Sequence, residues 1–326
     1  MSALTQKTVF HAPKPMGFNR NLHVLGRRSK TELVEVAFRA FMGVEGARRL
    51  VRDKEQLRAF IWEVSRNYHH NPYHNFQHAV DTTNVMAWLV TLPRLRRVLP
   101  DLYAFVLLLS ALVHDLDHPG TDNQWEIKTR SVRARRYENI AVLEHHSLDL
   151  TLELLKQPEY DLFARFAPKD RAEALRLLAL TVLATDFSMH RAFLQELETF
   201  LDNHRQPNLS GPAFLSLLAR TLIKAADISN TSKRFDQARL WGKRVMREYW
   251  AQGEREKRRN LPIGPLNDRS KVDFYGAQGW FIENQVTPLF RLLTRIEANA
   301  QDAVETLIRN YGIYKRMAEE RRGPGH

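Results

Sequence analysis

The apolar residues of this chain recur with helical rather than strand-like spacing over most of its length. Leu33, Ala37 and Phe41 lie four positions apart, and Leu178 and Val182 repeat that spacing much later. Apolar residues at this interval line one face of an α-helix. Alternation of apolar and polar residues, which would indicate strands, is scarce. The pattern therefore predicts an all-α fold.

Proline and glycine residues cut this pattern into many helices of ordinary length. No long flexible linker and no internal repeat divides the chain. We therefore expect a single compact multi-helix domain over residues 29–320. Residues 1–28 and 321–326 lack sustained periodicity and carry proline, glycine and charge, so we expect an N-terminal arm and a C-terminal tail there.

Composition narrows the classes of site that the chain can build. It has 326 residues, 44% of them apolar, which is enough for a packed core. It has no cysteine, which excludes disulfides, thiolate metal sites and cysteine nucleophiles. Any metal must therefore use nitrogen and oxygen ligands, and the 13 histidines are the obvious source of nitrogen.

The net charge of +12 arises from basic clusters that are dispersed along the chain. A nucleic-acid-binding face needs a clustered stripe, so we expect a solvated basic surface and no nucleic-acid partner. The longest apolar stretch, Tyr103 to Val113, is about half as long as a helix that spans a bilayer. The beginning of the chain has no continuous apolar segment typical of a secretory signal. We expect no membrane span and a cytoplasmic location.

A first candidate for metal binding follows Pro72, in the segment from Tyr73 to His78. His74 and His78 are four residues apart, and they share a face if a helix has already begun. Alone, this spacing is weak support for a metal site, because two such histidines are more often surface or core residues.

Carboxylates at the ends of apolar segments give a stronger signal. His114 and Asp115 end the most apolar segment of the chain, and Asp227 ends the run Leu222 to Ala226. An unpaired carboxylate is costly to bury, whereas a divalent cation compensates its charge. Asp115 is the natural bridge between two cations. Asp227 alone could instead cap the next turn.

These ligand types indicate which ions bind. Nitrogen and carboxylate ligands suit Zn²⁺ at a tight site, with Mn²⁺ or Fe²⁺ as alternatives. A second site that shares only Asp115 and is filled mainly by water suits Mg²⁺ or Mn²⁺. Two metals about 3.5–4 Å apart hold a bridging hydroxide and clamp a phosphoryl group. The chemistry indicated is phosphodiester hydrolysis.

Four motifs occur in order along the chain. They are His-Asn-x-x-His from His74, His-Asp-x-Asp-His-Pro-Gly from His114, Ala-Asp-x-Ser-Asn from Ala226 and Gln-x-x-Phe from Gln278. Together they resemble the class I cyclic-nucleotide phosphodiesterases, over roughly residues 55–295, and imply the HD-type phosphodiesterase catalytic fold. Tyr249 and the segments 67–76, 136–139 and 254–269 look most like the high-affinity cGMP-specific type nine.

The resemblance also implies roles for individual residues. His78, His114, Asp115 and Asp227 would bind the metals, His74 would be the general acid, and His118, Glu144 and Thr185 would support metal-bound waters. Gln278 and Phe281 would clamp the purine, with Asn230 and Tyr249 lining the same pocket. A metal-bound hydroxide would attack phosphorus, and an imidazolium at His74 could protonate the departing O3′. The product would be a nucleoside 5′-monophosphate.

Some positions depart from the family pattern. His145, His146 and Ser147 follow Glu144 where the family usually has Asn-His-His. Trp125, Thr231 and Phe187 also differ, and we expect them near the purine pocket. The favoured substrate is cGMP, with cAMP or dual specificity as alternatives.

Two other functions compete with this one. Another HD-type metal-dependent hydrolase would act on nucleoside mono- or triphosphates, but Gln278, Phe281 and Asn230 favour a cyclic purine nucleotide. A non-catalytic nucleic-acid-binding protein would leave the buried carboxylates unexplained. The sequence does not fix the oligomeric state, and a homodimer is one possibility.

Overall fold

The computed structural model describes residues 28–204 and 211–322. Within these two ranges all regular elements are helical, as the apolar spacing predicts. The expected N-terminal arm lies outside the described residues except for Arg28. The expected tail begins inside the last helix, which ends at Arg322, and its remainder also lies outside them.

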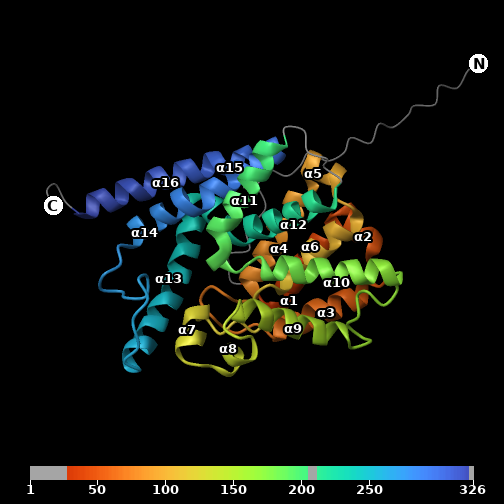
Figure 1. The fold of residues 1–326 in the computed structure, drawn as a ribbon, viewed down its shortest axis with the longest axis horizontal. Helices are drawn as coiled ribbons and strands as arrows, with labels where there is room; N and C mark the ends of the chain where they lie inside the picture. The colour runs from red at the N-terminus through yellow and green to blue at the C-terminus, as the bar shows by residue number, and fades with distance from the viewer. Residues whose placement is uncertain (1–27, 205–210, 323–326) are drawn as a thin grey trace, which may run out of the picture.

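Most of the helices follow one another with short connections, whereas residues 156–167 and 259–273 form longer ones (Figure 1). The first half of the chain forms α1 Lys30–Gly43, α2 Glu45–Leu50, α3 Lys54–Arg66, α4 Phe76–Thr91, α5 Pro93–Val98, α6 Asp101–Val113, α7 Asn123–Lys128, α8 Val132–Arg136 and α9 Val142–Leu155. The second half forms α10 Pro168–Leu183, η1 Phe187–Met189, α11 His190–Asn203, α12 Pro212–Asp227, η2 Ile228–Ser232, α13 Phe235–Arg258, α14 Phe274–Phe281, the π-helix η3 Ile282–Val286, α15 Thr287–Ile296, η4 Ala298–Ala300 and α16 Gln301–Arg322.

Helix α6 lies at the centre of the core. It is buried from Tyr103 to Val113, and it packs against α2, α4, α10 and α12, which surround it in Figure 1. A helix that is apolar on all sides is stable only when other elements cover every side. Because α6 is enclosed in this way, the residues that follow it, His114 and Asp115, emerge inside the protein.

A buried ion pair joins segments that are distant in the sequence. The Lys233 ammonium contacts the Asp81 carboxylate, and both side chains are almost completely buried. The amide of Asn310 in α16 donates to the carbonyl oxygens of Thr231 and Lys233, at 2.8 and 2.7 Å. These contacts fix η2, which follows Asp227, to both α4 and α16.

No single helix in the described ranges is long and apolar enough to cross a membrane. The segments Pro168–Leu183 and Phe187–Asn203 together have the length and composition of a membrane span, but the chain bends by 76° between them.

Candidate metal centre and active site

The four predicted metal ligands come from three helices whose ends meet. His78 lies in the first turn of α4, where the side chain of Asn75 caps the helix by accepting from the His78 backbone N–H at 3.1 Å. His114 and Asp115 follow α6 directly, and Asp227 is the last residue of α12. The apolar sequences of α6 and α12 bury these helices, so their ends deliver the polar residues to one point.

The donor atoms of these residues lie at the spacing of ligands around one ion. His78 Nε2 is 3.1 Å from Asp227 Oδ1 and 3.5 Å from Asp115 Oδ2. His114 Nε2 is 3.1 Å from Asp115 Oδ2 and 3.3 Å from Asp227 Oδ1. Ligands about 2.1 Å from a common ion lie roughly 3.0–3.4 Å apart in octahedral or tetrahedral arrangements. His78, His114 and Asp115 each offer a ligand atom within 4.8 Å of the others, which suits one divalent cation, and Asp227 Oδ1 lies beside both imidazoles.

Hydrogen bonding leaves two of these atoms available to a metal, whereas His78 Nε2 and Asp227 Oδ1 bond to each other. His114 Nδ1 lies 3.1 Å from the carbonyl oxygen of Ala111, so a proton on Nδ1 leaves the lone pair of Nε2 free. His114 Nε2 and Asp115 Oδ2 are buried and make no hydrogen bond within the described residues. Buried polar atoms without hydrogen-bond partners are uncommon, and a bound ion is a normal explanation for them.

The charges of this cluster depend strongly on one another. Burial lowers the pKa of His114, but the carboxylates of Asp115 and Asp227 outweigh it and raise that pKa well above its usual value. Burial raises the pKa of Asp227, but the imidazoles of His114 and His78 outweigh it and leave the pKa low. Both carboxylates are therefore ionised, which is the form that binds a cation, and a bound cation would take the place of the second proton on His114.

His74 lies outside the helix that carries His78. Helix α4 begins at Phe76, after the Asn75 cap, so the two histidines do not share a helical face. The prediction that both histidines share a helical face required the helix to begin before His74, and it does not. Their rings are still close, with centroids 6.1 Å apart, because the loop before α4 folds back over the site.

One amide fixes the shape of this loop. Asn71 Nδ2 donates to the carbonyl oxygen of His74 at 2.8 Å and to that of His118 at 2.7 Å. Gly120 has a φ of +71°, and a Cβ there would lie 2.9 Å from Asn71 Oδ1. This side chain and the hydrogen bond from the Asp117 backbone N–H to the carbonyl oxygen of Asn67, at 3.1 Å, join the loops on the two sides of the site.

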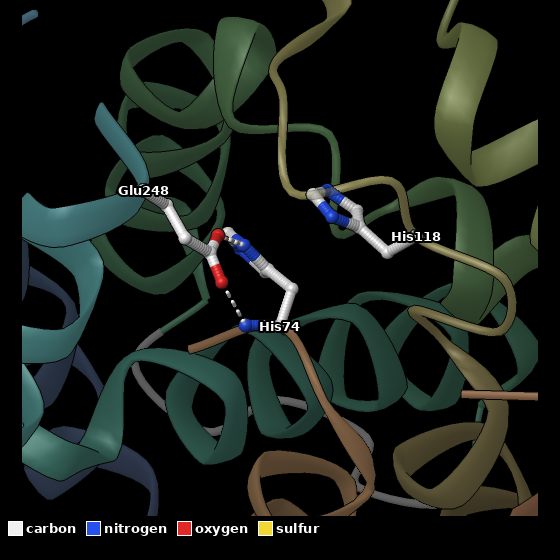
Figure 2. Close-up of side chains that lie close together, drawn as sticks. All are labelled: His74, His118 and Glu248. Atoms are coloured by element: carbon white, nitrogen blue, oxygen red, sulfur yellow. Dashed lines mark hydrogen bonds and ion pairs between the residues drawn. The ribbon is translucent and has the colours of Figure 1, made fainter. Parts of the chain in front are cut away.

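Glu248 on α13 is the direct partner of His74. Its Oε2 lies 2.5 Å from His74 Nδ1, and its Oε1 accepts from the backbone N–H groups of Tyr73 and His74 at 2.6 and 2.8 Å. Figure 2 shows the carboxylate between α13 and the loop, with the ring of His118 near His74. Because Nδ1 faces Glu248, His74 keeps Nε2 for a substrate.

Glu248 also determines the charge of His74. Burial lowers the pKa of His74, but the negative charges of Glu248 and Asp115 outweigh it and raise the pKa to about 9. The ring of His118 stacks on His74 with centroids 3.9 Å apart. Burial and the positive charge of His74 lower the pKa of His118 to about 3, so His118 is neutral. Near neutral pH the ring of His74 is therefore protonated and the ring of His118 is neutral.

Of the residues expected to support metal-bound waters, Glu144 lies close enough to Asp115 for the charge of that carboxylate to affect its pKa. Burial raises the pKa of Glu144 to about 7, and its Oε2 accepts from Asn123 Nδ2 at 2.9 Å. The hydroxyl of Thr185, just beyond α10, donates to the carbonyl oxygen of Val182 at 2.7 Å. Among the described residues, no hydrogen bond joins Glu144 or Thr185 directly to the four predicted ligands.

The predicted purine-binding residues lie on α14 and on the elements around it. Gln278 and Phe281 are both on α14, and Phe187, one of the departures from the family pattern, lies 5.8 Å from Phe281 between ring centroids. Asn230 on η2 donates from Nδ2 to the hydroxyl of Tyr73. Burial raises the pKa of Tyr249 to about 12, so its hydroxyl is a neutral donor.

Trp125 and Thr231, the other two departures that we expect near the purine pocket, contact residues outside α14. The guanidinium of Arg259 lies 5.2 Å from the ring of Trp125, at the end of α13. Thr231 is buried in η2, and its hydroxyl donates to the carbonyl oxygen of Ile228 at 3.1 Å.

Sequence reasoning missed Glu248, the residue that determines the protonation of His74. The sequence did contain an indication of its position. Glu248 follows the buried Trp241 by seven residues, so both lie on the buried face of α13. A carboxylate on a buried face needs a partner. The partner lies 174 residues earlier in the chain.

Comparison with known proteins supports this arrangement. A family model described as 3′5′-cyclic nucleotide phosphodiesterase matches residues 73–307. The high affinity cGMP-specific 3′,5′-cyclic phosphodiesterase 9A of Mus musculus is 34% identical over 240 residues, which cover 74% of this chain and 44% of the relative. The probable 3′,5′-cyclic-AMP phosphodiesterase pde-4 of Caenorhabditis elegans is 32% identical over 274 residues, covering 81% and 40%. This chain thus spans less than half of these relatives.

A solved structure gives the same result. The phosphodiesterase domain of the RhoPDE fusion protein from the choanoflagellate Salpingoeca rosetta has a TM-score of 0.87 and 25% identity to this chain. The match covers 91% of this chain and 94% of that one.

Proposed function

Because this chain belongs to the 3′,5′-cyclic nucleotide phosphodiesterase family, we propose that it hydrolyses a 3′,5′-cyclic purine nucleotide to the nucleoside 5′-monophosphate. The family also confirms the HD-type catalytic fold expected from the motifs. The observation that carries the proposal is the meeting of two imidazole nitrogens and two carboxylates beside the His74–Glu248 pair.

His78, His114, Asp115 and Asp227 would hold the tight metal site through the atoms whose spacing fits one cation. Imidazole and carboxylate donors suit Zn²⁺ there, and Mg²⁺ or Mn²⁺ suits a second site that shares Asp115. When bound, such ions supply a nucleophile from water and neutralise the charge of the phosphate. His118, Glu144 and Thr185 would accept hydrogen bonds from the waters of the second site.

His74 would act as the general acid. Its Nδ1 is held by Glu248, which orients the ring and keeps it protonated near neutral pH. Its Nε2 proton would pass to O3′ of the cyclic phosphate as the P–O3′ bond breaks. This transfer avoids an alkoxide leaving group, and the neutral imidazole takes up a proton from solvent after product release.

Recognition of the base would depend on α14. Phe281 offers an aromatic face for stacking, and the amide of Gln278 offers both donors and an acceptor to the purine edge. Asn230 and Tyr249 would line the same pocket. The similarity to a relative named as cGMP-specific supports cGMP as the favoured substrate, and the similarity to a relative named as a probable cyclic-AMP phosphodiesterase keeps cAMP as the alternative.

We assign the catalytic unit to residues 29–320 and keep the cytoplasmic location and the homodimer as predictions from the sequence. In the described ranges no single helix is long and apolar enough to span a membrane.

Steady-state kinetics of the purified chain with cGMP and cAMP in Mg²⁺ or Mn²⁺ tests the proposal. We expect formation of the 5′-monophosphate from at least one of them. Asp115→Asn should lower the metal content and abolish turnover, whereas His74→Ala should retain metal and lose about 10²–10⁴-fold in turnover. Release of no 5′-nucleotide from either cyclic substrate, together with cleavage of nucleoside mono- or triphosphates, would instead establish another HD-type phosphohydrolase.

A further inference from the structure

Gly242 occupies an unexpected position in the interior of α13. It is buried, and it follows the fully buried Trp241 in a helix that runs from Phe235 to Arg258. Apart from proline, glycine is the least favourable residue in the middle of a helix, since it leaves the unfolded backbone the most freedom. A glycine there needs a local reason, and its surroundings supply one.

The space that a side chain would need at Gly242 is filled by Gln278. A Cβ added to Gly242 would lie 2.5 Å from Gln278 Oε1 and 2.9 Å from Gln278 Cδ. Both distances are shorter than a Cβ contact can be, so one group must move. The atoms concerned are the end of a flexible side chain, so the amide of Gln278 would move before the backbone does.

Gln278 itself lacks a protein partner. Its side chain is only 6% exposed, and within residues 28–204 and 211–322 its amide makes no hydrogen bond to the protein. The amide atoms of Gln278 are not fully enclosed, so they can bond to water or to a ligand instead. The amide that rests on Gly242 is therefore held in place by packing alone.

We propose that Gly242 is a positioning residue for base recognition, because its missing side chain sets the depth at which the Gln278 amide lies in the purine pocket. The inference rests on the proposed function of Gln278. A methyl group at residue 242 would push the amide toward the substrate and out of line with the purine edge. The residue thus affects binding of the base and leaves the metal centre unchanged.

Two other glycines show that this role is specific. Gly253 lies on the same helix, but a Cβ there would be 2.1 Å from the backbone carbonyl oxygen of Asn267, so it serves loop packing. Gly312 lies inside α16, and a Cβ there would have only Arg316 Nη1 nearby, at 3.7 Å. Gly312→Ala is therefore a matched control, since it changes helix propensity without touching Gln278.

The test compares Gly242→Ala with wild type in steady-state kinetics and thermal unfolding. We expect KM for the cyclic nucleotide to rise about tenfold, which is the factor for one lost hydrogen bond to the base. The value of kcat should stay within about twofold, because base contacts are shared by the ground and transition states. The melting temperature should not fall, since alanine is the better helix former.

A double-mutant cycle shows whether Gly242→Ala changes KM through Gln278. In the Gln278→Ala background, Gly242→Ala should no longer change KM, because the group that it displaces is absent. Gly312→Ala should leave KM unchanged.

An unchanged KM in Gly242→Ala, an equal effect in both backgrounds, or a protein that unfolds at lower temperature would overturn the inference while the proposed function stands. Absence of cyclic-nucleotide turnover in the wild type would overturn both.

Discussion

Replacement of Glu248 by glutamine tests how the charge of His74 is maintained. The Glu248 carboxylate lies against His74 Nδ1 and is the strongest of the influences that raise the His74 pKa from 6.5 to about 9. Glutamine has nearly the same shape, and its Oε1 can still accept from the two backbone N–H groups. The substitution therefore removes one negative charge and leaves the loop in place.

The size of the effect follows from the protonated fraction of His74. A raised pKa keeps the imidazolium present up to a higher pH, so loss of Glu248 moves the alkaline limb of activity to lower pH. If the pKa falls to 6.5, about one tenth of the rings are protonated near pH 7.5. We expect kcat to fall about tenfold there, and the difference from wild type to shrink below about pH 6. Bound cations oppose the influence of Asp115, so the wild-type limb lies below pH 9.

A kcat–pH profile of Glu248→Gln from acidic to alkaline pH, with metal analysis of the same samples, measures this effect. Metal content and KM should match wild type, because Glu248 contacts neither the four predicted ligands nor Gln278. Glu153→Gln, on the exposed part of α9, is a control for the loss of one carboxylate. An alkaline limb at the wild-type position would refute the role of Glu248.

Three further predictions concern other parts of the molecule. Asp227→Ala should lower the metal content by at least tenfold and abolish turnover, as measured by elemental analysis and product release, because one of the four close donors is lost. Gln278→Ala should raise KM more than it lowers kcat, and steady-state kinetics on both nucleotides will show whether that split occurs. Lys233→Met leaves the Asp81 carboxylate buried and unpaired, so urea unfolding should show a loss of about 3–5 kcal/mol. A second substitution, Asp81→Asn, should recover part of that loss, and no recovery would contradict the pairing.

The sequence predicted that the candidate metal ligands would lie inside the protein, for a physical reason. His114, Asp115 and Asp227 each end a run of apolar residues, and a polar residue in that position must emerge inside the protein. Burial of apolar helices is a strong and nearly local signal. The burial of these two helix ends was therefore predictable before any distance was known.

Contacts between distant residues were much harder to predict. Whether His74 belongs to α4 depends on where that helix begins. Asn75 caps the helix, which begins at Phe76, so His74 lies before it. Element ends are the least certain feature of a sequence pattern. Glu248 was missed because its partner is in another part of the chain, and Gly242 was missed because only the fold brings Gln278 against it.

The amide of Asn71 has a consequence for how the site treats different ions. Because this side chain already joins the carbonyls of His74 and His118, the loops lose their conformational entropy when the protein folds. Ion binding then does not have to offset that cost, which favours high affinity. The same rigidity keeps His118, which would hold a metal-bound water, from moving outward for a larger ion. Such a centre discriminates between ions by their radius, and it should exclude Ca²⁺ more strongly than a centre with flexible loops would.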